Sequence, residues 1–259
     1  GTTREVPSFC FVLEVLGPGL LVVKHRTRED SPKFQNVAVF EGEQVKFLRY
    51  GGAHAEDHPP LLRALLAPEP DGGSDDAGDV VLRLAVSMRA HKRGGALLVV
   101  PAGSQGWRDS IVRPIAYGVE PAFTELAAVV RDPGEDGHTR ACGELGRVVD
   151  AVAGLTAVDG ATLITDRYEL LAFGVKIGRP DGRGQVERVV VSEPIEDGGA
   201  TILSPVQLGG TRHISAAQFA QDQRDAVALV ASQDGRFTIF AWSEAEGMVH
   251  AHRVETLLL

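Results

Sequence analysis

The chain has 259 residues, of which 44% are hydrophobic and 24% are charged. This composition is typical of a soluble globular protein and excludes a disordered or fibrous one, and the length suits two domains of ordinary size. The net charge of −9 repels DNA, RNA and anionic membranes, so we expect neither a nucleic-acid nor a membrane partner. Two widely separated cysteines, Cys10 and Cys142, indicate a reducing compartment and therefore a cytoplasmic protein.

The first part of the chain has the pattern of a β-rich fold. Apolar runs separated by Gly, Pro and charged turns predict strands over 9–15, 20–26 and 36–42. The first of these runs is interrupted by Glu14 and then by a Gly-Pro-Gly turn, so it predicts two strands rather than a membrane span. The segment 67–79 is rich in Pro, Gly and Asp and predicts a solvated acidic loop, because it lacks the carboxylate spacing of an EF-hand.

The middle of the chain contains a predicted helix, a strand and a linker. Apolar residues between Val81 and Met88 recur at helical spacing and are followed by cations and two glycines, which predicts a helix that ends near residue 93. The run 96–101 predicts a buried strand. Because the segment 131–139 has the composition of an exposed linker, we divide the chain into domains at 1–137 and 138–259.

In the second half, segments with the hydrophobic period of a helix alternate with segments that have the pattern of a strand. A helical stripe covers 139–156, strands are predicted over 160–165, 169–177 and 186–194, a helix is predicted over 214–226, and a hairpin is predicted over 227–242. We therefore expect an α/β (α+β) fold. In this fold a mixed sheet flanked by helices forms the C-terminal domain, and a smaller β-rich domain precedes it.

The stretch Gly209 to Ala217, "GGTRHISAA", has the residues of a phosphate site. Two glycines let the backbone approach a ligand, and the following helix offers free N–H groups and the positive end of its dipole. Arg212 presents a planar fork of donors that matches phosphate oxygens, and His213 can donate a hydrogen bond or ligate a metal. The alternative is a surface cap of a helix, which this stretch alone leaves open.

A second short stretch, Asp159-Gly160-Ala161, stands between the helix 139–156 and the next predicted strand. By itself it fits an ordinary turn, in which Asp accepts from the backbone and Gly supplies a positive φ. In chain order with the Gly-Thr-Arg-His stretch, however, it resembles the diadenylate cyclase family, whose DisA-type catalytic domain carries these two motifs and then a Ser-Glu-Glu strand end. The matching residues are Asp159-Gly160-Ala161, Gly210-Thr211-Arg212-His213 and Ser232-Gln233-Asp234-Gly235.

The resemblance covers about residues 140–242 and implies that the chain condenses two ATP into cyclic di-AMP and releases pyrophosphate. It implies that Asp159, Arg212 and His213 are catalytic. It also implies a divalent ion, Mn²⁺ or Mg²⁺, and a homodimer or higher homo-oligomer with facing active sites, since two ATP molecules are joined. The implied nucleotide-binding residues are Gly160, Ala161, Gly210, Thr211, Arg212, His213, Ser215 and Ser232.

The N-terminal part is similar, by its pattern of strands, to the DACNV sensor domains that precede some diadenylate cyclase domains, which implies that this part regulates the activity. In the catalytic part, Ile214 stands where the family has Arg or Lys, and Gln233 and Asp234 replace the two glutamates. The implied metal ligands are therefore Asp159, Gln233 and Asp234, and Gln233 is a weaker ligand than a carboxylate.

These departures leave two other functions open. One is a catalytically impaired nucleotide-binding module that acts as a sensor or scaffold. The other is a structural or partner-binding protein whose motifs are coincidences of turn chemistry, which predicts no nucleotide binding. His250 and His252 lack a third ligand nearby, so we expect a feature at a sheet edge rather than a zinc site. Trp107 and Trp242 are expected to be packing residues.

Overall fold

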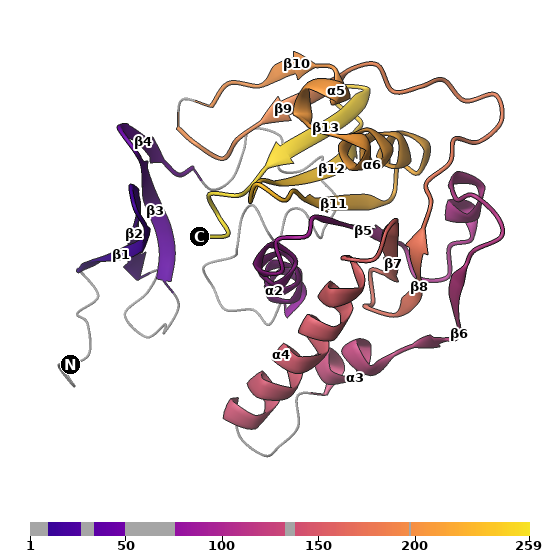
Figure 1. Cartoon of the computed structure of the whole chain (residues 1–259), viewed down its shortest axis with the longest axis horizontal. Coiled ribbons are helices and arrows are strands. Elements are labelled where there is room, and N and C mark those ends of the chain that lie inside the picture. Colours follow the sequence, from indigo (N-terminus) through magenta and orange to yellow (C-terminus); the bar gives the residue numbers. More distant parts are fainter. Residues whose placement is uncertain (1–9, 27–33, 50–75, 133–137, 197) are drawn as a thin grey trace.

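The computed structural model describes residues 10–26, 34–49, 76–132, 138–196 and 198–259. Within these ranges the chain forms a four-stranded antiparallel sheet, a nine-stranded mixed sheet and five α-helices (Figure 1). The predicted fold class is therefore confirmed: a mixed sheet flanked by helices follows a smaller β-rich part.

The N-terminal sheet is a meander in which each strand pairs with the next one along the chain. Its strands are β1 (Phe11–Gly17), β2 (Leu20–Arg26), β3 (Phe34–Glu41) and β4 (Gln44–Phe47). Val22 and Val39 are buried on one face, where they pack with Leu48 and with the C-terminal residues Leu257 and Leu259. This face therefore joins the small sheet to the end of the chain.

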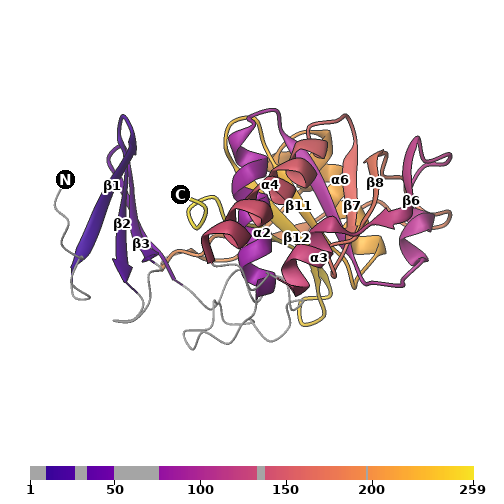
Figure 2. The same ribbon diagram turned by 90° about the horizontal axis from the view of Figure 1, so that it is seen from below.

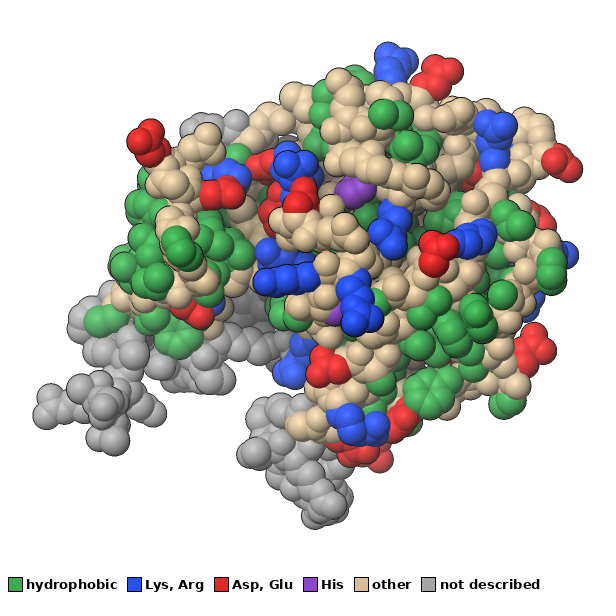
Figure 3. Space-filling model, in the orientation of Figure 1, with side chains coloured by type: hydrophobic (Ala, Val, Ile, Leu, Met, Phe, Trp, Pro, Cys, Tyr) green, Lys and Arg blue, Asp and Glu red, His purple; other side chains and the backbone are tan. Residues whose placement is uncertain are grey.

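The opposite face of the small sheet is apolar and exposed. The strand register places Phe11, Leu13 and Val15 of β1 beside one another on this face, and each of these side chains is more than half exposed. Phe47 of β4 is also more than half exposed. Figure 3 shows hydrophobic side chains gathered over this sheet, at the left of the molecule.

The nine-stranded sheet combines strands from residue 95 to residue 253. In spatial order it contains β10 (Thr201–Leu203), β9 (Val189–Ser192), β13 (Met248–Arg253), β12 (Phe237–Ser243), β11 (Val227–Ala231), β5 (Gly95–Val100), β7 (Ala161–Thr165), β8 (Leu170–Val175) and β6 (Tyr117–Phe123). β5 runs parallel to β7 and antiparallel to β11, and β13 runs parallel to β9. A short 3₁₀ helix, η2 (Gly106–Ser110), lies between β5 and β6.

Helices cover both faces of this sheet (Figures 1 and 2). On one face lie α2 (Asp76–Ala90), α3 (Glu125–Arg131) and α4 (His138–Leu155), and on the other lie α5 (Pro205–Leu208) and α6 (Thr211–Asp222). Successive strand residues point to opposite faces. A strand between two helical layers must therefore be apolar throughout, and all six residues of β5 are buried.

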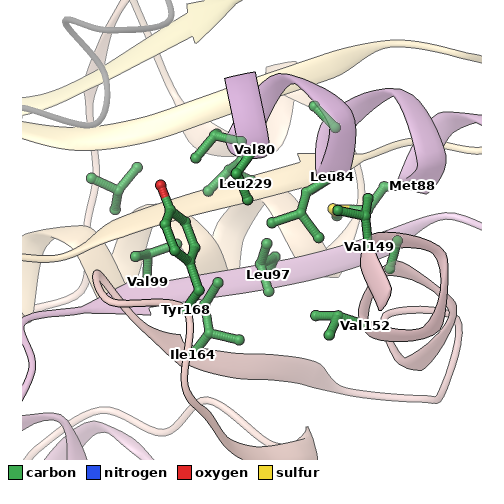
Figure 4. Close-up of a cluster of buried hydrophobic side chains, with 14 of the residues drawn as sticks. Val80, Leu84, Met88, Leu97, Val99, Val149, Val152, Ile164, Tyr168 and Leu229 are labelled. Atoms are coloured by element: carbon green, nitrogen blue, oxygen red, sulfur yellow. The ribbon is translucent and has the colours of Figure 1, made fainter. Parts of the chain in front are cut away.

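The core beneath α2 and α4 is aliphatic. Leu97 and Val99 of β5 point to this side and meet Leu84 of α2 and Val149 of α4 (Figure 4). The core beneath α6 contains the alternate residues of β5, such as Leu98, packed against Phe219. Trp107 and Trp242 are buried in this second core, which confirms their predicted packing role.

The predicted elements of both halves are confirmed, with shifts of a few residues at their ends. The helix predicted over 214–226 begins at Thr211, so Thr211, Arg212 and His213 lie in its first turn after the N-cap Gly210. Residues 76–79 of the predicted acidic loop belong to the first turn of α2, and residues 67–75 lie outside the described residues. Residues 133–137 of the predicted linker also lie outside them.

The predicted division at 137/138 does not separate the sheets. β5 and β6 precede residue 138, but β5 pairs with β7 and β11, and β6 pairs with β8. In addition, α2 packs in one core with α4. Since backbone hydrogen bonds across a sheet join strands into one body, the segment from Asp76 onward belongs with the second half of the chain.

The prediction for His250 and His252 is also corrected. They lie on β13, an interior strand that pairs with β12 on one side and β9 on the other, so they are not at a sheet edge. Their rings are buried and stacked, with centroids 3.9 Å apart, and Ser192 Oγ lies within hydrogen-bond distance of both. Cys10 is partly exposed, and the side chain of Cys142 lies outside the described residues.

In the part of the chain that the structure describes, we find no helix with the length and apolar character needed to cross a membrane.

Candidate functional site

The Asp-Gly-Ala stretch lies at the start of β7, where β8 passes close to it. Gly160 has φ +114, and a Cβ at this residue would lie 2.6 Å from the carbonyl carbon of Gly174. A side chain therefore does not fit, and glycine is required by the neighbouring strand. Gly160 is one of the implied nucleotide-binding residues, but the backbone of β8 takes the space that its missing side chain leaves. The stretch places the Asp159 side chain in solvent, 90% exposed.

The Gly-Thr-Arg-His stretch enters α6 from the same edge of the sheet. Gly210 is the N-cap of α6 and has no side chain with which to cap the helix. Arg212 extends over the loop before β5, where a Cβ on Gly94 would lie 3.1 Å from its Nη1. The absence of a side chain at Gly94 therefore leaves room for the guanidinium, a second role for a glycine that the sequence indicated as a helix stop.

Four strand ends meet at this edge because β5 and β7 begin there while β8 and β11 end there. With the N-terminus of α6 they enclose a pocket of about 540 Å³, within the range of about 300–1,000 Å³ that is usual for small-molecule sites. The predicted residues that line it are Asp159, Gly160, Ala161, Gly210, Thr211, Arg212, His213, Ser215, Ser232 and Gln233. The structure thus brings residues of both motifs to the wall of one pocket.

Lys176 is a pocket residue that sequence reasoning missed. It follows the last residue of β8, and its Nζ lies 2.5 Å from Oδ2 of Asp159. The hydrogen bond from this ammonium and its charge lower the pKa of the Asp159 carboxyl below its ordinary value, and Arg212 adds to the effect. Asp159 is therefore ionised at neutral pH. The strand register explains this contact: Ala161 pairs with Val175, so the residues just outside this pair, Asp159 and Lys176, come close together.

His213 is placed differently from the other residues of its motif. It is buried beneath Gly209 and lies edge-on to the ring of Phe240, with ring centroids 6.1 Å apart. Burial lowers the pKa of its imidazole below the ordinary value of 6.5, against the opposing charge of Asp234. At neutral pH His213 is therefore uncharged and can offer the pocket one hydrogen bond but no positive charge.

The predicted metal ligands each have another partner in the structure. Asp159 and Gln233 line the pocket, whereas Asp234 is not among the described lining residues and pairs with Arg236, with 3.4 Å between Oδ2 and Nε. Gln233 donates to the carbonyl of Arg93. Among the described residues, no group of three or more His, Cys, Asp and Glu side chains could hold a metal. The described pocket lining therefore offers a divalent ion one carboxylate, Asp159, which already pairs with Lys176. This is too few ligands for the chain alone to hold such an ion.

A second, smaller hollow of about 200 Å³ lies by β9 and β10 and is lined in part by Glu193, Arg236 and Arg253. Arg253 and Glu193 form an ion pair there, with 2.7 Å between Nη1 and Oε1. None of the residues that the sequence predicted for binding or catalysis lines this hollow in the described structure. The larger pocket is therefore the candidate site.

Comparison with known proteins gives no family for the chain. No protein family model and no curated protein matches it. A solved structure, described as the hypothetical membrane spanning protein from Bacillus cereus, is 14% identical over 73% of this chain and 67% of its own, with a TM-score of 0.40. A likeness of this size assigns no function to this chain.

Proposed function

We propose that the pocket binds ATP and that the protein is a diadenylate cyclase, which joins two ATP molecules into cyclic di-AMP and releases two pyrophosphates. One observation carries the proposal. Two motifs about fifty residues apart in the sequence, each typical of this family, line the same pocket at one edge of the sheet. Turn motifs that were coincidences would have no reason to meet in space.

The phosphate groups of ATP are expected to lie at the N-terminus of α6. The backbone N–H groups of a first helical turn and the helix dipole favour anions. Thr211 offers a hydroxyl donor at this position, and Arg212 offers a guanidinium that can bind phosphate oxygens in pairs. Ser215 and Ser232 add further hydroxyl groups to the wall of the pocket.

Asp159 is suited to act on the ribose. Its carboxylate is exposed and ionised, so it can accept a hydrogen bond from a 3′-hydroxyl and orient that oxygen. The hydroxyl oxygen then attacks the α-phosphate of a second ATP and loses its proton to solvent, a phosphodiester bond forms, and the bond to pyrophosphate breaks. Each of two ATP molecules makes one such attack, so two protomers must face each other across a two-fold axis.

A nucleotide-binding module without turnover is the second candidate. Ile214 removes one cation that the family motif contains, Gln233 is neutral, and Asp234 does not line the described pocket. These three differences concern metal binding and phosphate charge rather than the shape of the pocket. They support retention of nucleotide binding with loss of chemistry.

Incubation with ATP and Mn²⁺ or Mg²⁺, followed by chromatography for cyclic di-AMP, tests the proposal. Product is expected from the native chain. We expect none from Asp159→Asn, which removes the carboxylate charge but retains ATP binding in calorimetry. Asp181→Asn is the matched control, because Asp181 is exposed and outside the described pocket lining. ATP binding without product under any divalent ion favours the module instead, and absence of binding contradicts both.

A further inference from the structure

The charge of the candidate pocket is unusual for a site that binds polyphosphate through a divalent ion. The ionisable side chains among its described lining residues are Asp159, Lys176, Arg212 and His213. One of these is an anion, two are cations, and His213 is buried and uncharged. The pocket therefore carries excess positive charge from the chain alone, before any metal ion enters.

Lys176 places its ammonium beside Asp159, the one carboxylate among the described lining residues of the pocket. Its ammonium lies 2.5 Å from Oδ2 of Asp159, and both groups belong to the wall of the pocket. A cation that approaches this oxygen is repelled by the ammonium beside it, so the two cations compete for this carboxylate. The rest of the pocket supplies no second carboxylate among the described residues that could hold the ion in compensation.

The Lys176 ammonium is also able to leave Asp159 and bind another anion. The side chains are 54% and 90% exposed, respectively, and exposed ion pairs add little to folding stability. Lysine has a flexible four-carbon stem and three rotatable donors. The ammonium can therefore turn from the carboxylate to a phosphate oxygen without disturbing the fold, since β8 and β7 are fixed by their own pairing.

We propose that Lys176 replaces a divalent ion in binding: together with Arg212 it holds the polyphosphate of a nucleotide directly, so that the pocket binds its ligand without metal. This inference rests on the proposed function, and it specifies how the phosphate charge is neutralised. A divalent ion then competes with Lys176 for Asp159 rather than completing the site.

Calorimetric titration of the full chain with ATP and with inorganic triphosphate, in EDTA and in Mg²⁺, tests the inference. The native chain is expected to bind both ligands in EDTA. Lys176→Met is expected to bind about tenfold more weakly in EDTA, which corresponds to about 1.4 kcal/mol for one lost charged contact, and to recover part of this loss in Mg²⁺, because the ion now has free access to Asp159.

Two further variants complete the design. Lys176→Arg keeps the charge and is expected to bind in EDTA within about threefold of the native chain. Arg179→Met removes a cation from the same loop, outside the described pocket lining, and is expected to change nothing. Thermal unfolding of each variant checks that the fold is retained, as expected for exposed side chains.

Binding of ATP by the native chain only in Mg²⁺ would overturn the inference, as would equal weakening of Lys176→Met in EDTA and Mg²⁺. In either case cyclic di-AMP formation could still be measured, so the proposed function would survive. If neither ATP nor triphosphate binds under any condition, the proposed function itself fails, and the inference fails with it.

Discussion

The two faces of the nine-stranded sheet are used differently. On one face α2 and α4 lie along the strands and bury aliphatic side chains. On the other face α6 also buries apolar residues, including Phe219, but its first turn stands at the edge where four strands begin or end, and the candidate pocket lies there. The difference between the two faces is therefore the position of a helix N-terminus: the pocket forms where α6 begins. The strand residues that face α6 are as apolar as those that face α2 and α4.

The largest expected effect comes from substitutions in the two cores. Leu84 of α2 and Phe219 of α6 are both fully buried, so Leu84→Ala and Phe219→Ala are each expected to lower the free energy of unfolding by about 3–5 kcal/mol. Urea denaturation measures this loss. ATP affinity of the folded protein should fall in Phe219→Ala alone, because α6 carries Arg212. An equal effect of both variants on affinity would contradict the division between the faces.

Arg212→Ala is expected to act on binding and leave packing intact. A hydrogen bond to a charged group is worth about 1.5–3 kcal/mol, so the affinity for ATP should fall by a factor of about ten or more in calorimetry. The free energy of unfolding should change by less than about 0.5 kcal/mol. The matched control is Arg224→Ala, whose guanidinium lies 4.0 Å from the ring centroid of Trp242, and neither residue is among the described lining residues of the pocket. A similar loss of affinity in both variants would remove the assigned role.

Gly160→Ala is expected to affect the region where the site and the sheet meet. The residue would have an unfavourable φ and a Cβ in contact with the backbone of β8, which predicts a loss of about 1–3 kcal/mol in the free energy of unfolding. Gly182→Ala has a similarly positive φ but meets no atom within 4 Å, so its loss should be smaller. If the two variants lose the same stability, then contact with β8 is not the reason for the glycine.

The smallest expected effect is the contribution of His213 to the pH dependence of the free energy of unfolding. Burial holds its pKa below 6.5 in the folded state, so the folded state binds fewer protons than the unfolded chain as pH falls below about 6.5. The free energy of unfolding should therefore decrease with falling pH in this range. Urea denaturation above and below pH 6.5 should show a shallower decrease in His213→Gln, and an unchanged slope would mean that the imidazole is not the group responsible.

Much of the fold could be predicted because both faces of the large sheet are covered. A strand such as β5 is then apolar at every position and stands out in the sequence. The interior position of β13 was not predicted, because the polar partner of His250 and His252 is Ser192 of β9, about sixty residues earlier. The division at 137/138 followed the linker-like composition of residues 131–139, whereas the large sheet pairs strands from both sides of this position, β5 with β7 and β6 with β8.

The candidate site was predicted in part. Asp159 and Arg212 were found because their motifs are local in the sequence, and the pocket brings them together. Lys176 was missed because a lysine after an apolar run has no local signal of its function. Its position opposite Asp159 depends on the pairing of Ala161 with Val175, and a register of this kind is a property of the folded sheet.

The position of β5 between β11 and β7 also has a consequence for biosynthesis. During translation β5 emerges more than a hundred residues before β11, the strand that covers one of its edges. Until residues 227–231 have left the ribosome, an entirely apolar strand keeps an open hydrogen-bonding edge, which is a template for aggregation. Chains that stop before residue 227 are therefore expected to need a chaperone or to precipitate, whereas chains that include β11 can close the sheet.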